Sequence, residues 1–225
     1  MKIEIRKKCL FVFASMLFAL NSNAADSEKE VLKIDYPEPL VKGTEIPKGI
    51  PNLEKARKKN TAPASFKIPK GCENVAEGKY VTGSDEDPSE GDLDLIVDGD
   101  ADGNEIVQLK SGLQWVQIDL EDKFALYAIQ LWHYHAEARV YNDVIIQVSD
   151  DEDFIEGVKT IFNNDHDNSS GLGKGSDKNY IEEFYGKTID AKGMKGQYVR
   201  FYSKGSSGDK ANHYVEIQIF AKELK

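Results

Sequence analysis

The chain has 225 residues, of which 40% are apolar and 30% charged, and its formal net charge is −10 at pH 7. A mean hydropathy of −0.51 excludes a protein with many membrane spans. Ten Phe, ten Tyr and two Trp exclude a fully disordered chain. The acidic charge argues against nucleic-acid binding, which needs a basic surface to neutralise phosphates.

The N-terminus has the layout of a signal peptide. An apolar run over residues 9–20, too short to span a bilayer easily, follows the basic residues Lys2, Arg6, Lys7 and Lys8. Ser22 and Ala24 then place small residues before a cleavage site. We expect residues 1–24 to be removed and the mature protein to be secreted or periplasmic, without membrane insertion. The short apolar run disfavours the alternative, a signal anchor.

Cleavage after Ala24 would remove Cys9 and leave Cys72 as the single cysteine of the mature chain. One thiol cannot form an intrachain disulfide, so the hydrophobic core must stabilise the fold, with or without a metal. Cys72 could pair between chains, but an unused thiol is the favoured interpretation.

Residues 25–71 form a segment rich in Pro and Lys. It holds six of the seven prolines of the chain, namely Pro37, Pro39, Pro47, Pro51, Pro63 and Pro69. Prolines at this density break helices and deny hydrogen-bond donors to strands. We therefore predict an extended arm or linker, some of whose scattered apolar residues pack along the domain that follows at residues 72–225. The arm is slightly basic, whereas that domain is strongly acidic.

The domain shows the alternating apolar pattern of half-buried strands. The pattern is clearest over residues 116–120, 144–148, 198–202 and 215–220. A more apolar run at residues 124–132 predicts a central strand. Shorter candidate strands lie at residues 79–82, 93–97, 106–109, 159–162 and 187–189. Short strands with polar, Gly-rich connections and no amphipathic helix predict an all-β sandwich or barrel.

The strand order also predicts which connections meet. If successive strands run antiparallel, one end of the sandwich gathers residues 98–112, 133–142, 163–186 and 204–213. The opposite end gathers residues 121–123, 150–158 and 190–197. The first set holds all four histidines, and function usually resides on such loops.

Five segments resemble a known family, in the family's order. The most specific is Trp115-Val116-Gln117-Ile118-Asp119-Leu120; the others lie at residues 73–82, 95–100, 197–202, where Gln197 replaces the usual Arg, and 215–220. They resemble discoidin domains, also called coagulation factor five/eight type C domains. The resemblance implies a jelly-roll sandwich of about eight main strands, of the galactose-binding-like class. Many such domains bind glycans, as family 32 carbohydrate-binding modules do, and others bind phospholipid head groups or proteins.

Three aspartates on one short turn indicate a cation site. Asp98, Asp100 and Asp102 would repel one another unless a cation lay among them, and Ca²⁺ favours such hard oxygen ligands. The turn is not an EF-hand, because Leu109 stands where the bidentate Glu would be. The family resemblance implies a structural calcium bound by Asp98, Asp100 and Glu216, with Asp102 the least secure ligand. The alternative is that these residues only form Asx-turns.

The loops of the first end have the composition of a sugar site. Asn, Asp, His and Arg side chains hold vicinal hydroxyls, and the candidate ligand-binding residues are His133, His135, Arg139, Asn164, Asp165, His166, Asn212 and His213. The alternatives are a core position for Trp132, a carboxylate partner for His133, and an Asn/Asp loop that satisfies its own backbone. A zinc site built on His133, His135, His166 and Asp165 is a further alternative.

No catalytic motif appears. The chain has no nucleophile elbow, Cys-His arrangement or phosphate loop, although a hydrolase without a motif would escape detection. The sequence therefore predicts a secreted, non-catalytic binding module whose favoured partner is a glycan. The alternative is a protein-protein interaction or cell-surface assembly module, in which the arm docks an extracellular partner. Sugar identity, oligomeric state and order in the arm are not determined by the sequence.

Overall fold

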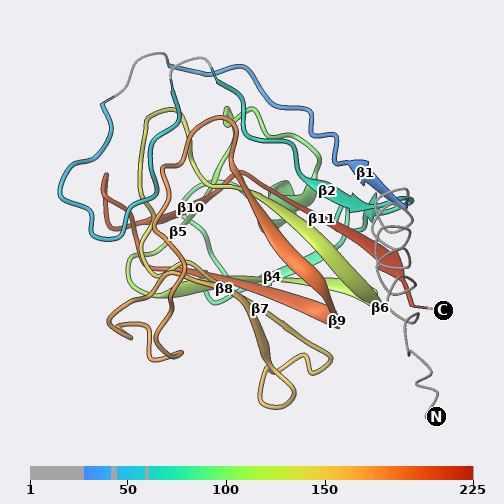
Figure 1. The fold of residues 1–225 in the computed structure, drawn as a ribbon. Coiled ribbons are helices and arrows are strands. Elements are labelled where there is room, and N and C mark those ends of the chain that lie inside the picture. The colour runs from blue at the N-terminus through green and yellow to red at the C-terminus, as the bar shows by residue number, and fades with distance from the viewer. Residues whose placement is uncertain (1–27, 42–44, 59–60, 225) are drawn as a thin grey trace, which may run out of the picture.

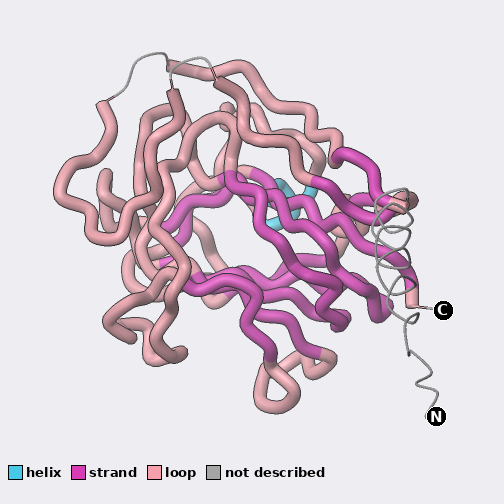
Figure 2. The backbone as a smooth tube through the Cα atoms, viewed as in Figure 1, coloured by secondary structure: helices cyan, strands magenta, loops and turns pink. Residues whose placement is uncertain are grey.

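The computed structural model describes residues 28–41, 45–58 and 61–224, so the predicted signal peptide lies outside the described residues. Within them the regular structure is almost entirely strand (Figure 1, Figure 2). The strands are β1 (Lys29–Val31), β2 (Lys67–Pro69), β3 (Glu73–Asn74), β4 (Tyr80–Gly83), β5 (Val107–Leu109), β6 (Gln114–Trp132), β7 (Ile145–Ser149), β8 (Lys159–Asn163), β9 (Lys187–Ser203), β10 (Asn212–Tyr214) and β11 (Glu216–Glu223).

Two long antiparallel strands, β6 and β9, organise the fold. They pair along most of their length, and the register shifts between Asp119 and Phe124. Glu121 and Lys192 have positive φ angles of 69° and 55° near this shift. The paired strands bend there and fold back, so that both of their ends lie on the same side of the molecule (Figure 1).

The bend divides the strands between two layers. In one layer, the first half of β6 pairs with β4 and with the second half of β9, which continues to β7 and β8. In the other layer, the second half of β6 pairs with the first half of β9 and with β11, which continues to β3. β5 and β10 form a separate short pair. This arrangement confirms the predicted all-β sandwich.

The hydrophobic core fills the space between the layers. It takes alternate residues from both, such as Ile118 and Val199 from one and Leu126 and Ile219 from the other. All four side chains are inaccessible to solvent. Alternation places them inward because successive side chains of a strand point to opposite faces.

Three predicted elements were wrong in detail. The predicted strands at residues 116–120 and 124–132 are parts of one strand, β6, and residues 190–197 lie within β9 rather than in a connection. The turn expected from the polar residues Glu121, Asp122 and Lys123 is instead a bend within a continuous strand. The bend still reverses the direction of the chain, as a turn would, because the two halves of β6 run in opposite directions.

Residues 93–97 form the 3₁₀ helix η1 (Leu93–Val97) and not a strand. The adjacent residues Ile96 and Val97 are both buried. A half-buried strand would expose one of two neighbours, whereas a tight helical turn can bury both.

The segment before the domain packs along its surface. β1 pairs with β2, and Ile68 of β2 is buried. Ile34 packs on a small apolar cluster of Ala101, Trp132 and Val215, which lies outside the main core. The prediction that some arm residues pack on the domain is thus met, and Ile34 is one of the residues that cover the fully buried Trp132. No described helix is long and apolar enough to cross a membrane.

Candidate functional site

The structure brings together the four segments predicted to meet at one end of the sandwich, called here the loop end. His135 Nε2 lies 2.9 Å from the carbonyl oxygen of Ala101. The guanidinium of Arg139 donates to Asp209 at 2.7 Å, and the amide of Glu182 donates to the carbonyl of Arg139 at 2.7 Å. The prediction from alternating strand directions therefore grouped these loops correctly. It assumed that the chain reverses direction at residues 121–123, and the bend in β6 has that effect.

Arg139 is the centre of the accessible part of the loop end. Its two terminal nitrogens donate to Glu137 at 2.6 Å and to Asp209 at 2.7 Å. Its guanidinium also lies over the ring of Tyr134, 4.9 Å from the centroid. The side chain of Arg139 is 10% exposed, but those of Glu137 and Asp209 are 55% and 43% exposed. Glu137 and Asp209 therefore present two carboxylates at the surface, with the partly exposed ring of Tyr134 beside them and the largely buried guanidinium of Arg139 between them.

His133 and Glu182 form a fully buried pair below this surface. His133 Nδ1 lies 3.1 Å from Glu182 Oε2, and neither side chain is accessible to solvent. Burial lowers the pKa of His133 to about 3 and raises the pKa of Glu182 well above its usual value. Both groups are therefore neutral near pH 7, with the Glu182 carboxyl donating its proton to Nδ1. The carboxyl partner considered as the alternative role of His133 is thus present.

Aromatic rings enclose this pair. The His133 ring stacks on Tyr141 with centroids 4.1 Å apart, and Tyr214 lies 5.0 Å away. The hydroxyl of Tyr141 lies 3.1 Å from His213 Nδ1, and the other nitrogen of His213 lies 3.1 Å from Gln108 Oε1. Ring stacking on Tyr141 and the hydrogen bond from Tyr141 to His213 therefore connect the buried pair to His213, which lies 3.9 Å from Asp209.

The predicted ligand-binding residues are mostly inside the loop end. The buried ones are His133, His135, Arg139, Asn164, Asp165, Asn212 and His213, whereas His166 is partly exposed. Asn212 accepts from Ser203 and Gly205 and donates to the carbonyls of Lys110 and Gly112. The structure gathers these residues at one end but gives most of them partners within the protein, and their contact with a ligand stays a prediction.

The Asn/Asp loop at residues 163–168 satisfies its own backbone. Asp165 accepts from the amides of Ser169 and Ser170 and from the Ser170 hydroxyl. Although burial alone would raise the pKa of Asp165, these hydrogen bonds lower it to about 2. Asn164 accepts from the amide of Val144, which ties the loop to the start of β7. These hydrogen bonds agree with the alternative interpretation, in which the Asn and Asp side chains serve to order the loop.

The histidines are not arranged for zinc. His133 contacts Glu182, His135 contacts Ala101, and His166 lies 2.8 Å from both Asn52 Nδ2 and the carbonyl of Asp177. Among the described residues, the side chains of Asp143, Asp165 and Asp167 could together hold a metal ion, because one oxygen of each carboxylate lies within 4.8 Å of the other two. Lys204 already lies 3.7 Å from Asp143 in that group.

The Asp98 turn lies against the start of β11. Each aspartate accepts from the amide two residues later: Asp98 from Asp100, Asp100 from Asp102, and Asp102 from Asn104. These are the Asx-turns considered as the alternative. Asp102 also accepts from the Asn104 side chain, so both of its oxygens are occupied.

Asx-turns do not explain Glu216. This carboxyl is fully buried beside the turn, and its Oε2 accepts a long hydrogen bond of 3.4 Å from the amide of Gly99. Its Oε1 is buried without a hydrogen-bond partner. Burial, reinforced by the negative charge of Asp98, raises the pKa of Glu216 to about 8. An unpartnered buried carboxylate oxygen facing further carboxylates fits a cation as its missing partner.

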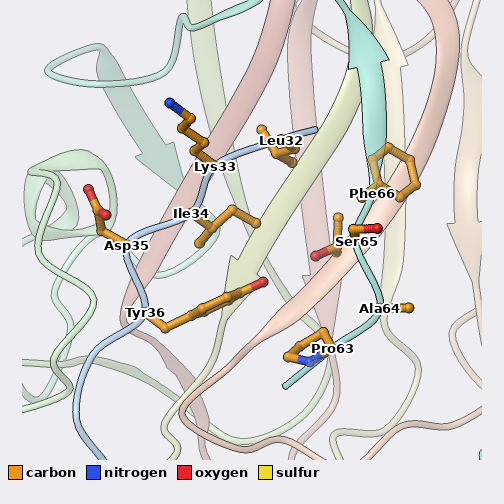
Figure 3. Close-up of a pocket in the computed structure, with 10 residues that line it drawn as sticks. Leu32, Lys33, Ile34, Asp35, Tyr36, Pro63, Ala64, Ser65 and Phe66 are labelled. Carbon is orange, nitrogen blue, oxygen red and sulfur yellow. The ribbon is translucent and has the colours of Figure 1, made fainter. Parts of the chain in front are cut away.

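A second concave feature lies in the arm (Figure 3). A hydrogen bond of 2.8 Å from the Leu32 amide to the Phe66 carbonyl joins two segments of the arm. Beyond this bond, the segments at residues 32–36 and 63–66 diverge. They enclose a cavity of about 410 Å³ that is closed on the domain side by Thr188 of β9. No feature of the sequence indicates this cavity, because the cavity depends on how the two arm segments dock.

Sequence reasoning also missed Glu182, Asp209 and Tyr134. None of them belongs to a motif, and acidic residues are common throughout the chain. One available signal was the position of Glu182 directly after the apolar pair Tyr180 and Ile181, which is typical of a residue drawn into a core. The partners of these residues lie far away in sequence, so only the folded chain shows them.

Solved structures with similar folds are distant in sequence. A family 89 glycoside hydrolase from Clostridium perfringens is 20% identical, with a TM-score of 0.50 over 67% of this chain and 15% of that chain. A chitosan-binding module from a Paenibacillus sp. IK-5 chitosanase/glucanase is 18% identical over 65% of this chain and 98% of its own, with a TM-score of 0.48. The family 32 carbohydrate-binding module of AlyQ, in complex with 4,5-unsaturated mannuronic acid, is 16% identical, with a TM-score of 0.47. The match covers 63% of this chain and 93% of that module.

No family model and no curated protein matches the sequence. The matched part of this chain corresponds to only 15% of the hydrolase, so it does not carry over that enzyme's activity. At 20% identity the likeness shows the fold alone. The expected β-sandwich fold is nevertheless confirmed by the strand arrangement of this chain, and the hydrolase match at a TM-score of 0.50 is consistent with it.

Proposed function

We propose that the protein is a non-catalytic module that binds a carbohydrate at the loop end. The observation that carries the proposal is the surface group of Tyr134, Glu137, Arg139 and Asp209. A guanidinium held by two carboxylates is fixed in orientation, and it sits beside an aromatic ring. Fixed donors, acceptors and a ring face are the groups that recognise sugar hydroxyls and the apolar side of a pyranose.

The buried residues of the loop end would support this surface. His213 lies 3.9 Å from Asp209 and contacts Tyr141, and the Arg139 carbonyl pairs with Glu182. Of the eight predicted ligand-binding residues, Arg139 and His166 would then reach the ligand. The other six would hold the loops in place.

A calcium ion would stabilise the turn beside this end. Asp98, Asp100 and Glu216 would hold it, because Glu216 Oε1 lacks a partner and the two aspartates each retain a free oxygen. Asp102 fits less well, since Asn104 occupies both of its oxygens. The ion would neutralise the carboxylates and fix the segment that contacts His135 through Ala101.

Export through the predicted signal peptide belongs to the same proposal, because a glycan-binding module acts on extracellular or periplasmic sugars. The absence of a catalytic motif in the sequence supports a binding role. A cleaved glycan after prolonged incubation with the pure protein would refute that role.

The test is a glycan array with the full mature chain, run in calcium and again in chelator. We expect binding to one class of sugar, and a loss of about tenfold or more in affinity for Arg139→Lys, which keeps the charge but cannot bridge two carboxylates. Lys123→Ala is the matched control: it removes an exposed cation paired with Asp150 at the opposite end. It should leave binding unchanged, whereas a blank array with folded protein would refute the proposal.

The same preparation tests the calcium site. Calcium should raise the melting temperature of the wild-type chain by several degrees, because it binds the folded state alone. Glu216→Gln should remove that increase while leaving the metal-free protein folded, since the amide is nearly isosteric with the protonated carboxyl. An equal calcium response in this variant would show that Glu216 is not a ligand.

A protein partner remains a second candidate. Large apolar side chains at least 36% exposed are concentrated in the arm, namely Val31, Tyr36, Leu40, Val41 and Ile46. If the array is blank, a full chain that captures a partner and loses it on Val41→Ser and Ile46→Ser would favour this role.

A further inference from the structure

The arm cavity is separate from the loop-end surface. Its walls are residues 32–36 on one side and 63–66 on the other, over the outer face of β9 (Figure 3). A cavity of about 410 Å³ lies within the size range of small-molecule sites, roughly 300–1,000 Å³. It is also open to solvent on the side where the two arm segments separate.

Lys33 and Asp35 are among the residues that line this cavity, but the side chains that point into it are uncharged (Figure 3). Ile34 and Tyr36 point into the space between the segments, and Ser65 points toward them from the other side (Figure 3). Lys33 and Asp35 point away from it. A charged ligand would therefore lose hydration without gaining a counter-ion, and a neutral ligand is favoured.

Tyr36 provides a fixed aromatic surface. Its ring packs edge-on against Tyr185, with centroids 5.1 Å apart and an interplanar angle of 85°. The side chain keeps 37% of its surface exposed beside the cavity. A partly exposed ring whose position is fixed by a neighbouring ring can offer apolar surface for stacking.

Hydroxyl groups supply the polar contacts. Thr188 donates to Gln130 at 2.5 Å, which orients its hydroxyl, and it also shares a hydrogen bond with the Tyr36 side chain, so one lone pair remains for a ligand. Burial raises the pKa of Tyr36, so its hydroxyl stays protonated and can both donate and accept. Ser65 adds a third hydroxyl.

We infer that this cavity is a second carbohydrate subsite, which binds one uncharged pyranose unit by stacking on Tyr36 and hydrogen bonding to Ser65 and Thr188. The inference rests on the proposed carbohydrate-binding function and adds a second contact, lined by residues other than those of the loop-end surface group. An apolar peptide side chain would use the ring but leave the hydroxyls without new partners, so a sugar is favoured.

The test uses ligand-observed NMR titrations of the full chain. The probes are the methyl glycosides of glucose and galactose and N-acetylglucosamine, with glucuronate as the charged counterpart. We expect Tyr36→Ala to raise the Kd by about tenfold or more and Tyr36→Phe to change it by less than about threefold. Ser65→Trp, which fills the cavity and keeps Tyr36, should also abolish binding here. Unchanged melting curves confirm that each variant is folded.

Tyr134→Ala at the loop end separates the two proposals. Loss of binding in the two cavity variants with retention in Tyr134→Ala supports the subsite. Loss in Tyr134→Ala alone overturns the subsite and leaves the loop-end function standing. Absence of any sugar binding overturns both, and equal affinity for glucuronate overturns the preference for an uncharged unit.

Discussion

Two buried acids show how different partners change the role of a carboxyl group. Glu182 has an imidazole beside it and is neutral together with it. Glu216 faces other carboxyls and leaves one oxygen without a partner. Each acid leaves Oε1 buried without a partner, but Glu182 has the His133 ring beside its Oε2, whereas Glu216 has the negative charge of Asp98 nearby. Sequence composition alone does not distinguish them, because both are single glutamates in an acidic chain.

His133 makes the folded state sensitive to acid. Its pKa is about 3 when folded and about 6.5 when unfolded, so between these values the imidazole binds a proton in the unfolded state that it does not bind in the folded state. Stability contributed by this group is therefore present above about pH 6.5 and falls as the pH drops toward 3. The groups packed around it are Glu182, Tyr141, Tyr180 and Tyr214.

We predict that His133→Gln weakens this acid dependence. The slope of the unfolding free energy with pH should fall by up to about 1.4 kcal/mol per pH unit between roughly pH 5 and 4, because one titrating group is lost. Urea denaturation of both proteins at several pH values measures the slope. His166→Gln is the control, since that ring is partly exposed and has no comparable enclosure. Parallel slopes for wild type and His133→Gln would contradict the prediction.

At the scale of elements, one carboxylate orders a long loop. The connection between β8 and β9 has no regular structure, yet Asp165 fixes its first turn through Ser169 and Ser170. The Gly175 amide donates to the Asp165 carbonyl at 2.6 Å, which ties the middle of the loop to its start. A fully buried aspartate is tolerated here because its oxygens are hydrogen bonded.

We predict that Asp165→Ala destabilises the protein by about 2–3 kcal/mol, since several hydrogen bonds to a charged group are lost in a buried place. The matched control is Asp167→Ala, two residues further on, which removes an exposed carboxylate that accepts from Ser169. It should change stability by less than about 0.5 kcal/mol. Chemical denaturation measures both, and equal effects would show that Asp165 does not organise the loop.

At the scale of the whole molecule, the arm completes the outer surface of one layer. Glu54 pairs with Lys187 at 2.5 Å and Arg57 with Glu183 at 2.5 Å. Asn179 is bonded to the arm through both main chain and side chain. These contacts are polar and local, so the arm is attached to the domain without entering its main core.

We predict that removing residues 25–66 leaves the sandwich folded but exposes Trp132. In a Trp115→Phe background, its fluorescence should shift to longer wavelength and become accessible to iodide, because Ile34 no longer covers it. Far-ultraviolet circular dichroism checks that the sheets remain. Ile34→Ser in the full chain should give a smaller shift in the same direction. Unchanged emission in the truncated chain would show that the arm does not protect Trp132.

Much of the architecture was predictable because its signals are local. Alternating apolar residues predicted β7, β11 and the outer parts of β6 and β9, and the prolines predicted an extended arm. The polar residues at 121–123 and the adjacent apolar pair Ile96 and Val97 misled the assignment. A bend inside a strand and a short helical turn have local sequences that resemble a loop and a strand.

The sequence by itself determined the sheet class, the position of the bend and the set of loops that meet at one end. These follow from the period of apolar residues and the direction of successive strands. Only the tertiary structure decided that most of the predicted binding residues are enclosed, that Glu182 and Asp209 are their partners, and that the arm forms a cavity over β9. Burial and pairing depend on residues far apart along the chain, such as His133 and Glu182, which become neighbours only when the layers pack.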